Sequence, residues 1–194
     1  MNVRRVCVYA ASSRQVDGEY FEAARVLGRE LAQSGVTIVY GGGSVGLMGA
    51  LADSALAHNG RLVGVIPRFM MDLQWGNPRV QEMIVVEDLR ERKLKLATDV
   101  DAAIALPGGS GTLDELTEVL TLKRLGQFVK PVILVNVRGF FDPLVALLER
   151  CIEERFMDER HRAMWTVVQR ADEVVRAIGD SPEWGEDALG YAAL

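Results

Sequence analysis

Short apolar runs alternate with amphipathic segments along most of the chain. Apolar runs bounded by turn residues predict buried strands, and apolar residues recurring at helical spacing predict helices that pack on them. The predicted strands are residues 3–11, 36–40, 62–66, 83–86, 102–106 and 131–135. The predicted helices are residues 20–33, 45–58, 89–98, 113–125, 144–156 and 172–178. Residues 67–79 show no clear periodicity and are expected to be irregular.

Apolar strands that alternate with helices are typical of an α/β protein with a mostly parallel sheet and helices on both faces. The pattern therefore predicts a Rossmann-like fold. A length of 194 residues fits one domain with a substantial core. We expect residues 1–180 to form a single Rossmann-like nucleotide-binding domain. Residues 181–194, which are rich in Gly, Pro and acidic side chains, are expected to form a loose C-terminal tail.

Composition and charge exclude several function classes. A net charge of -5 argues against a nucleic-acid partner, which usually requires a basic surface. No apolar run approaches membrane-spanning length, and no signal-like segment precedes the first strand, so we expect a cytoplasmic protein without a membrane partner. Cys7 and Cys151 are expected to be buried thiols. His58 and His161 lie far apart in the sequence, so no zinc site is expected.

Two glycine-rich turns carry the candidate chemistry. The first, residues 41–49, follows the strand 36–40, and the second, residues 107–115, follows the strand 102–106. Free N–H groups and the positive dipole end at the start of a helix can hold a phosphate. Parallel sheets bind ligands beyond the carboxyl ends of their strands, where both turns lie. The candidate phosphate-binding residues of these turns are Gly41, Gly42, Gly43, Ser44, Met48 and Gly108.

The first turn satisfies the dinucleotide pattern G-x-G-x-x-G at Gly41, Gly43 and Gly46. That pattern also requires an acid near the end of the next strand, and residues 65–68 supply none. NAD or FAD binding is therefore disfavoured, whereas a plain tight turn and contact with a smaller phosphate ester both remain open. Neither turn ends in the Gly-Lys-Ser/Thr of a P-loop, so ATP hydrolysis is also disfavoured.

The second turn leads into a helix with three acids in its first turns: Asp114, Glu115 and Glu118. Acids are common there because they complement the helix dipole, and this structural interpretation is favoured for Asp114 and Glu118. The anion cradle beside Glu115 favours a chemical role for that residue instead. The charged run 89–93 is by default a solvated face. Because it precedes a neighbouring strand of the sheet, one of its arginines could reach the same crevice.

Three motifs together point to a known family. Residues 107–115 match P-G-G-x-G-T-x-x-E, Glu91-Arg92-Lys93 precedes them, and the first glycine turn lies upstream. With these motifs the chain resembles the LONELY GUY (LOG) family of cytokinin riboside 5'-monophosphate phosphoribohydrolases, often mislabelled lysine decarboxylases. The likeness runs from about Val6 to about Glu149 and includes the opening strand and loop, residues 7–13. The resemblance implies a Rossmann-like homodimer with sites near the subunit interface and no metal or organic cofactor.

The resemblance also assigns site residues. Arg92 and Glu115 match the family's catalytic arginine and glutamate. The matching positions that line the family's nucleotide site are Lys93, Gly109, Ser110, Gly111, Thr112, Leu113, Asp114 and Thr121.

The chain departs from the family pattern at three places. It has Leu89-Arg90 where the family usually has Met-His, Ser110 in place of an aromatic residue, and residues 72–75 in place of a Pro-Arg-Glu-like segment. These changes surround the expected base pocket and leave the preferred base open.

The implied reaction is hydrolysis of the N-glycosidic bond of an adenosine 5'-monophosphate, with or without an N6 modification. Two alternatives remain open: an AMP nucleosidase, and a non-catalytic nucleotide or molybdenum-cofactor binding protein of the same superfamily. The joint presence of Arg92 and Glu115 favours an enzyme. Lysine decarboxylation is disfavoured because it requires pyridoxal phosphate on a lysine, and Lys93 lies on a charged helix without a supporting motif.

Overall fold

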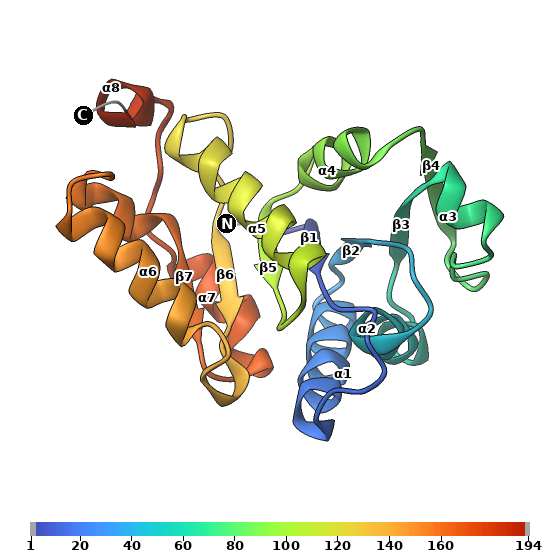
Figure 1. Cartoon of the computed structure of the whole chain (residues 1–194). Coiled ribbons are helices and arrows are strands. Elements are labelled where there is room, and N and C mark those ends of the chain that lie inside the picture. Colours follow the sequence, from blue (N-terminus) through green and yellow to red (C-terminus); the bar gives the residue numbers. More distant parts are fainter. Residues whose placement is uncertain (1–2, 193–194) are drawn as a thin grey trace.

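The computed structural model of the chain describes residues 3–192 (Figure 1). Its seven strands form one sheet in the order β4-β3-β2-β1-β5-β6-β7, and every neighbouring pair is parallel. The expected α/β, Rossmann-like class is therefore confirmed. The strands are β1 (Arg5–Tyr9), β2 (Thr37–Tyr40), β3 (Leu62–Pro67), β4 (Glu82–Val86), β5 (Ala102–Ala105), β6 (Val132–Val135) and β7 (Thr166–Val168).

Helices connect consecutive strands of this sheet (Figure 1). The α-helices are α1 (Gly18–Gln33), α2 (Gly46–Ala57), α3 (Arg68–Asp72), α4 (Leu89–Ala97), α5 (Ser110–Arg124), α6 (Asp142–Glu153), α7 (Val174–Asp180) and α8 (Leu189–Ala192). The short 3-10 helices are η1 (Val137–Gly139), η2 (Glu159–Met164), η3 (Ala171–Glu173) and η4 (Glu186–Ala188). Between residues 3 and 192, no helix combines the length and hydropathy needed to cross a membrane.

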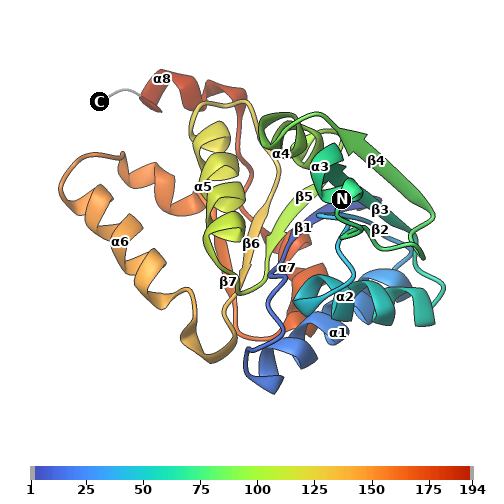
Figure 2. The same ribbon diagram turned by 45° about the vertical axis from the view of Figure 1, so that its right-hand side comes forward.

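The central strands β3, β5 and β6 and most of β1 and β2 are buried on both faces, as their apolar sequences predict, whereas the edge strand β4 is partly exposed. Val6 and Val8 of β1 join a core formed with α1, α2 and α7, whereas Cys7 and Tyr9 point to the opposite core, formed with α4, α5 and α6. Figure 2 shows these two helical layers on either side of the strands. Cys7 is a buried free thiol, and Cys151 is a half-buried free thiol on α6.

The strand order places a ligand-binding crevice at one position. Strands β2, β3 and β4 follow one another outward on one side of β1, whereas β5, β6 and β7 extend outward on the other side. The order in which strands are added therefore reverses between β1 and β5, and open parallel sheets bind ligands at such a position, beyond the carboxyl ends of their strands. The loops that leave β1, β2 and β5 meet there, and they include both glycine turns.

Gly46 joins the first glycine turn to the loop that follows β1. Its φ is +63°, in the left-handed region that favours glycine. A Cβ at this position would lie 2.6 Å from the carbonyl oxygen of Ser12 and 2.7 Å from that of Ala11. The third glycine of the G-x-G-x-x-G pattern therefore has a packing role, since it lets the start of α2 pack directly on the β1 loop.

The C-terminal segment differs from the loose tail expected for residues 181–194. Trp184 is buried, its indole Nε1 donates to the carbonyl oxygen of Lys123 at 2.6 Å, and Tyr191 meets its ring edge-to-face. These two aromatic side chains anchor the segment to the rest of the domain. The Gly, Pro and acidic content of the segment predicted a loose tail because it does not reveal this anchor. Residues 193–194 lie outside the described part of the chain.

We expect Gly46→Ala to lower the free energy of unfolding by at least about 2 kcal/mol, because both the positive φ and the contact with Ser12 oppose a side chain. Gly179→Ala in α7 is the matched control, since a Cβ there meets nothing within 4 Å. That variant should gain up to about 1 kcal/mol from helix propensity. Urea unfolding of both variants measures the difference, and equal stabilities would contradict this account of the turn.

Candidate active site

A cavity of about 650 Å³ opens at the carboxyl ends of the central strands. Its walls come from the β1 loop, the first glycine turn, the start of α5, the tip of Arg92 from α4 and the segment that links α3 to β4. Because β2 and β1 lie between β3 and β5 in the sheet, the α3–β4 segment and the N-terminus of α5 form opposite walls. A ligand in this cavity therefore lies across the position, between β1 and β5, where the order of strand addition reverses.

Arg92 lies across the ends of two strands. Its Nε donates to the carbonyl oxygen of Val65 at 3.1 Å, and its Nη2 donates to that of Gly41 at 3.2 Å. A Cβ on Gly41 would collide with this guanidinium, so the first glycine of the turn is required to admit the arginine. The backbone thus fixes the orientation of Arg92 before any ligand binds, leaving Nη1 directed at Glu115.

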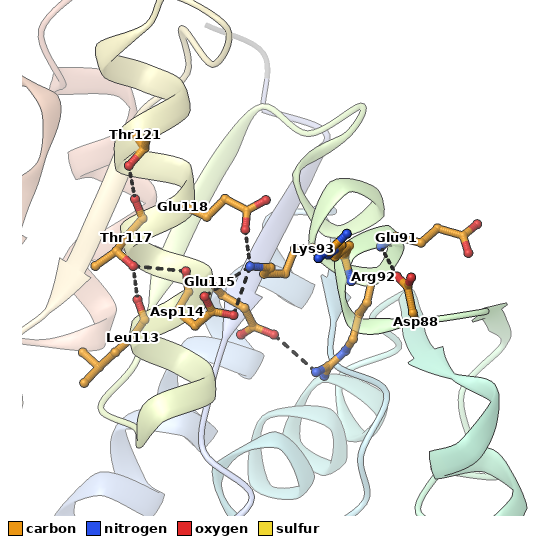
Figure 3. A network of polar contacts seen from close by, with 11 residues as sticks. Asp88, Glu91, Arg92, Lys93, Leu113, Asp114, Glu115, Thr117, Glu118 and Thr121 are labelled. Atoms are coloured by element: carbon orange, nitrogen blue, oxygen red, sulfur yellow. Dashed lines mark hydrogen bonds and ion pairs between the residues drawn. The ribbon is translucent and has the colours of Figure 1, made fainter.

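Glu115 faces Arg92 from α5. Its Oε1 lies 3.4 Å from Nη1 of Arg92, and the two side chains are only 10% and 13% exposed (Figure 3). Burial raises the pKa of Glu115 to about 7, against the opposing effect of the Arg92 charge. A carboxyl group with such a pKa can take up or release a proton near neutral pH, which is typical of groups that act in catalysis.

The N-terminus of α5 supplies the anion-binding wall. Residues 109–112 line the cavity at the start of this helix, where free N–H groups and the dipole favour a phosphate. The Thr112 side chain is buried and lies over Gly108, where a Cβ would overlap it. Gly108 therefore makes room for Thr112, and Thr112 is the residue of this pair that reaches the cavity.

A second charged cluster joins α4 to α5 beside the Arg92–Glu115 pair. The Lys93 ammonium forms ion pairs with Asp114, at 3.1 Å, and with Glu118 (Figure 3). These contacts raise the pKa of Lys93, chiefly through the hydrogen bond to Glu118. Lys93 borders a narrow gap that it shares with Glu115 and Tyr9, and this gap has no room for a solvent molecule. The cluster therefore holds the two helices in register.

The structure brings most of the expected site residues together, but not all of them. The expected residues that line the cavity are Gly41, Gly43, Ser44, Met48, Arg92, Gly109, Ser110, Gly111, Thr112 and Glu115. The expected residues that lie outside its lining are Gly42, Lys93, Gly108, Leu113, Asp114 and Thr121. Thr121 lies further along α5, more than two turns after Thr112, and is exposed. Its hydroxyl donates to the carbonyl oxygen of Thr117 (Figure 3).

Sequence reasoning missed part of the lining. Ser12, Ser13 and Arg14 enter from the loop after β1, Met70 enters from α3, and Gln74 and Trp75 enter from the α3–β4 segment. The position of the first loop at a strand end was an available signal, since such ends meet at one edge of a parallel sheet. The second segment has no periodicity and offered none. Within residues 3–192, no cluster of three or more His, Cys, Asp or Glu side chains is placed to bind a metal.

Comparisons with known proteins show the family to which the chain belongs. The family model described as "possible lysine decarboxylase" matches residues 48–178. The cytokinin riboside 5'-monophosphate phosphoribohydrolase LOG7 of Arabidopsis thaliana is 41% identical over 94% of this chain and 85% of its own length. The rice (Oryza sativa subsp. japonica) phosphoribohydrolase LOG is 43% identical over 89% of this chain and 71% of its own length. The chain therefore belongs to the LOG family of phosphoribohydrolases.

A solved structure shares the fold at low sequence identity. The molybdenum cofactor carrier protein of Chlamydomonas reinhardtii superposes with a TM-score of 0.69 and 19% identity, over 92% of this chain and 98% of that protein. At this identity the likeness concerns the arrangement of strands and helices alone. It confirms the Rossmann-like architecture and carries no information about the ligand of this chain.

The raised pKa of Glu115 predicts a pH-dependent cost in stability. Between its ordinary pKa of 4.5 and the native value of about 7, the folded protein binds a proton that the unfolded chain releases. Stability is therefore lost as the pH rises through this window, by up to about 3 kcal/mol. Glu115→Gln mimics the protonated form, so its stability relative to the parent protein should increase between pH 5 and pH 8.

Urea unfolding at both pH values measures this effect. Glu153→Gln on α6 is the control, because it removes a carboxylate that is 59% exposed. An equal pH dependence of the two variants would exclude a buried, proton-binding Glu115.

Proposed function

We propose that the chain hydrolyses the N-glycosidic bond of adenosine 5'-monophosphates, including N6-modified ones, to free base and ribose 5-phosphate. The observation that carries this proposal is the buried Arg92–Glu115 pair at the centre of a cavity whose wall includes a helix N-terminus. The family's curated members, which are named for this reaction on cytokinin riboside 5'-monophosphates, support it. A metal or organic cofactor has no part in the proposed reaction.

The phosphate, ribose and base of a nucleotide occupy three different regions of the cavity. The 5'-phosphate binds at the N-terminus of α5, where residues 109–112 offer N–H groups and the Thr112 hydroxyl. Ser12, Ser13 and Arg14 from the adjacent β1 loop add donors for the phosphate oxygens. The ribose then lies over the Arg92–Glu115 pair, and the base extends towards the α3–β4 segment. Binding energy from the phosphate aligns C1' with the reacting groups.

Glu115 acts on the sugar. In the transition state the bond between C1' and the base nitrogen breaks, its electron pair leaves with the base, and positive charge develops on the ribose. The ionised carboxylate of Glu115 stabilises this charge and accepts a proton from the water that attacks C1'. Transfer of this proton to the departing base releases the base in its neutral form and returns Glu115 to its ionised form. Arg92, held by the carbonyls of Val65 and Gly41, keeps Glu115 in place and balances negative charge on the departing group.

The geometry disfavours two other functions. A lysine that forms a Schiff base needs a free amine, but Lys93 is held as a cation by Asp114 and Glu118. A non-catalytic carrier needs the phosphate wall but not a buried carboxylate with a pKa of about 7 beside an arginine. A plain AMP nucleosidase uses the same groups, so it differs from the main proposal only in the base it prefers.

We also propose the assembly and setting that the family resemblance implies. Residues 1–180 act as one nucleotide-binding domain, and two copies of the chain form a homodimer in the cytoplasm. Leu113, Asp114 and Thr121 lie on α5 outside the cavity, so they can contact a nucleotide only if a second copy brings its site to this helix. Sedimentation of the purified protein tests the dimer directly.

Glu115→Gln should reduce turnover of AMP and of isopentenyladenosine monophosphate by at least about a hundredfold, because the neutral amide can neither stabilise the sugar cation nor accept a proton. Nucleotide binding, measured by calorimetry, should be largely retained. Glu153→Gln on α6 is the control, because this carboxylate is 59% exposed and lies outside the cavity lining. Chromatography of the released base gives the rates, and near-parental turnover by Glu115→Gln would overturn the assignment.

The pH dependence of kcat/KM should show a limb near pH 7, with activity falling below it as Glu115 becomes protonated. The positive charge of Arg92 lowers the pKa of Glu115, so Arg92→Gln should move this limb to higher pH as well as lower the rate. The ionisation of the substrate phosphate is the same for both proteins and cannot cause such a shift. Superimposable limbs would exclude Glu115 as the titrating group.

A further inference from the structure

We propose that Trp75 is the residue on which the base of the nucleotide stacks, and that it thereby determines which nucleotides the cavity accepts. The inference rests on the proposed function for the identity of the ligand, and it concerns a residue with no part in the bond-breaking step. Trp75 also lies in the segment where the chain departs from its family's usual sequence.

The exposure of Trp75 sets it apart from the other tryptophans. Its side chain is 55% exposed and lines the cavity, whereas Trp165 and Trp184 are each only 8% exposed and belong to the core. A large aromatic ring left this open to solvent at a cavity wall offers a flat apolar surface to a ligand. Purine rings stack on such surfaces, and the indole of tryptophan has the largest face available.

The backbone holds Trp75 firmly at this wall. Its N–H donates to the carbonyl oxygen of Met70 at 3.0 Å, which closes the turn after α3. The next residue, Gly76, forms a bridge with Gly43 of the first glycine turn. The N–H of buried Asn77 then donates to the carbonyl oxygen of Gly42 at 2.8 Å. The ring is therefore carried by a segment that is fastened to the first glycine turn, although the segment lacks regular structure.

Backbone strain next to this residue supports a functional role. Gln74 has a φ of +59°, a left-handed conformation that is unusual for a residue with a side chain. Its N–H donates to the carbonyl oxygen of Met71 at 2.8 Å, and its side chain also lines the cavity. Strained residues persist where the surrounding structure requires them, and they are frequent at ligand sites.

The position of Trp75 matches the place where the base must lie. The phosphate site at the start of α5 and the α3–β4 segment are opposite walls, and the Arg92–Glu115 pair lies between them. In a nucleotide the base is attached to C1' and the phosphate-bearing C5' to C4', so the two groups extend from opposite ends of the ribose ring. A ribose placed over Glu115 with its phosphate at α5 therefore directs its base towards Trp75. Met70 lies beside it in the lining and adds a flexible apolar contact.

Tryptophan fluorescence provides the test. Trp165 and Trp184 are buried and do not line the cavity, so a ligand in the cavity can contact only Trp75 among the three tryptophans. The experiment uses the Glu115→Gln protein, so that ligands are not consumed during the titration. AMP and isopentenyladenosine monophosphate should quench the emission, whereas ribose 5-phosphate, which lacks a base, should bind without quenching. Trp75→Phe in the same background should abolish the quenching yet keep the affinity for AMP within about threefold, since a phenyl ring still stacks.

Trp75→Ala should weaken binding of AMP by at least about fivefold in calorimetry and leave the affinity for ribose 5-phosphate unchanged. Phe69→Ala is the matched control, because Phe69 is an aromatic residue of the preceding helix α3 that is 48% exposed and does not line the cavity. Circular dichroism confirms that each variant is folded. A change caused only by loss of exposed apolar surface would appear in both alanine variants.

The inference is overturned if quenching persists in Trp75→Phe, if ribose 5-phosphate quenches as strongly as AMP, or if Trp75→Ala binds AMP unchanged. It is also overturned if the protein binds neither AMP nor its modified form. The proposed function fails separately: quenching by AMP without any release of base by the parental protein would refute the hydrolase while retaining Trp75 as the base platform. Release of base by the parental protein without quenching would support the hydrolase and refute Trp75 as the base platform.

Discussion

The site depends on how the Arg92 guanidinium is held. Two of its nitrogens donate to the carbonyl oxygens of Val65 and Gly41, at the ends of adjacent strands, and the remaining nitrogen faces the carboxylate of Glu115. Backbone carbonyls at strand ends cannot move without disturbing the sheet, so the charge is fixed in advance. Because the carboxylate is largely buried, its pKa is raised, and the charge of Arg92 is the largest influence that opposes this rise.

Several parts of the fold serve this contact. Gly41 lacks the side chain that would block the guanidinium, and Gly46 lets the β1 loop pack on α2 beside it. Lys93 joins α4 to α5 through Asp114 and Glu118, which keeps the residues on either side of the cleft in register. The glycine turns and the charged cluster thus have structural duties that make the catalytic geometry possible.

The sequence predicted the features that depend on local pattern. Apolar runs separated by amphipathic helices are enough to predict a parallel sheet, and strand ends are enough to place both glycine turns at one edge. The position of residues 89–93 before a neighbouring strand indicated that an arginine could reach the crevice, but only the family resemblance selected Arg92 together with Glu115, 23 positions further along the chain. Residues 12–14 and Trp75 reach the cavity through loop geometry that no periodicity encodes. β7 is only three residues long, which is too short for an apolar pattern to reveal.

The docking of the C-terminal segment has a practical consequence. Trp184 donates its indole N–H to the last turn of α5, and Arg124 of the same turn donates to the carbonyl oxygen of Ala192. The helix that presents Glu115 at one end is thus braced at its other end by residues 184–192. A substitution that releases Trp184 would therefore loosen the far end of the same helix that carries the catalytic carboxylate, although it lies outside the cavity.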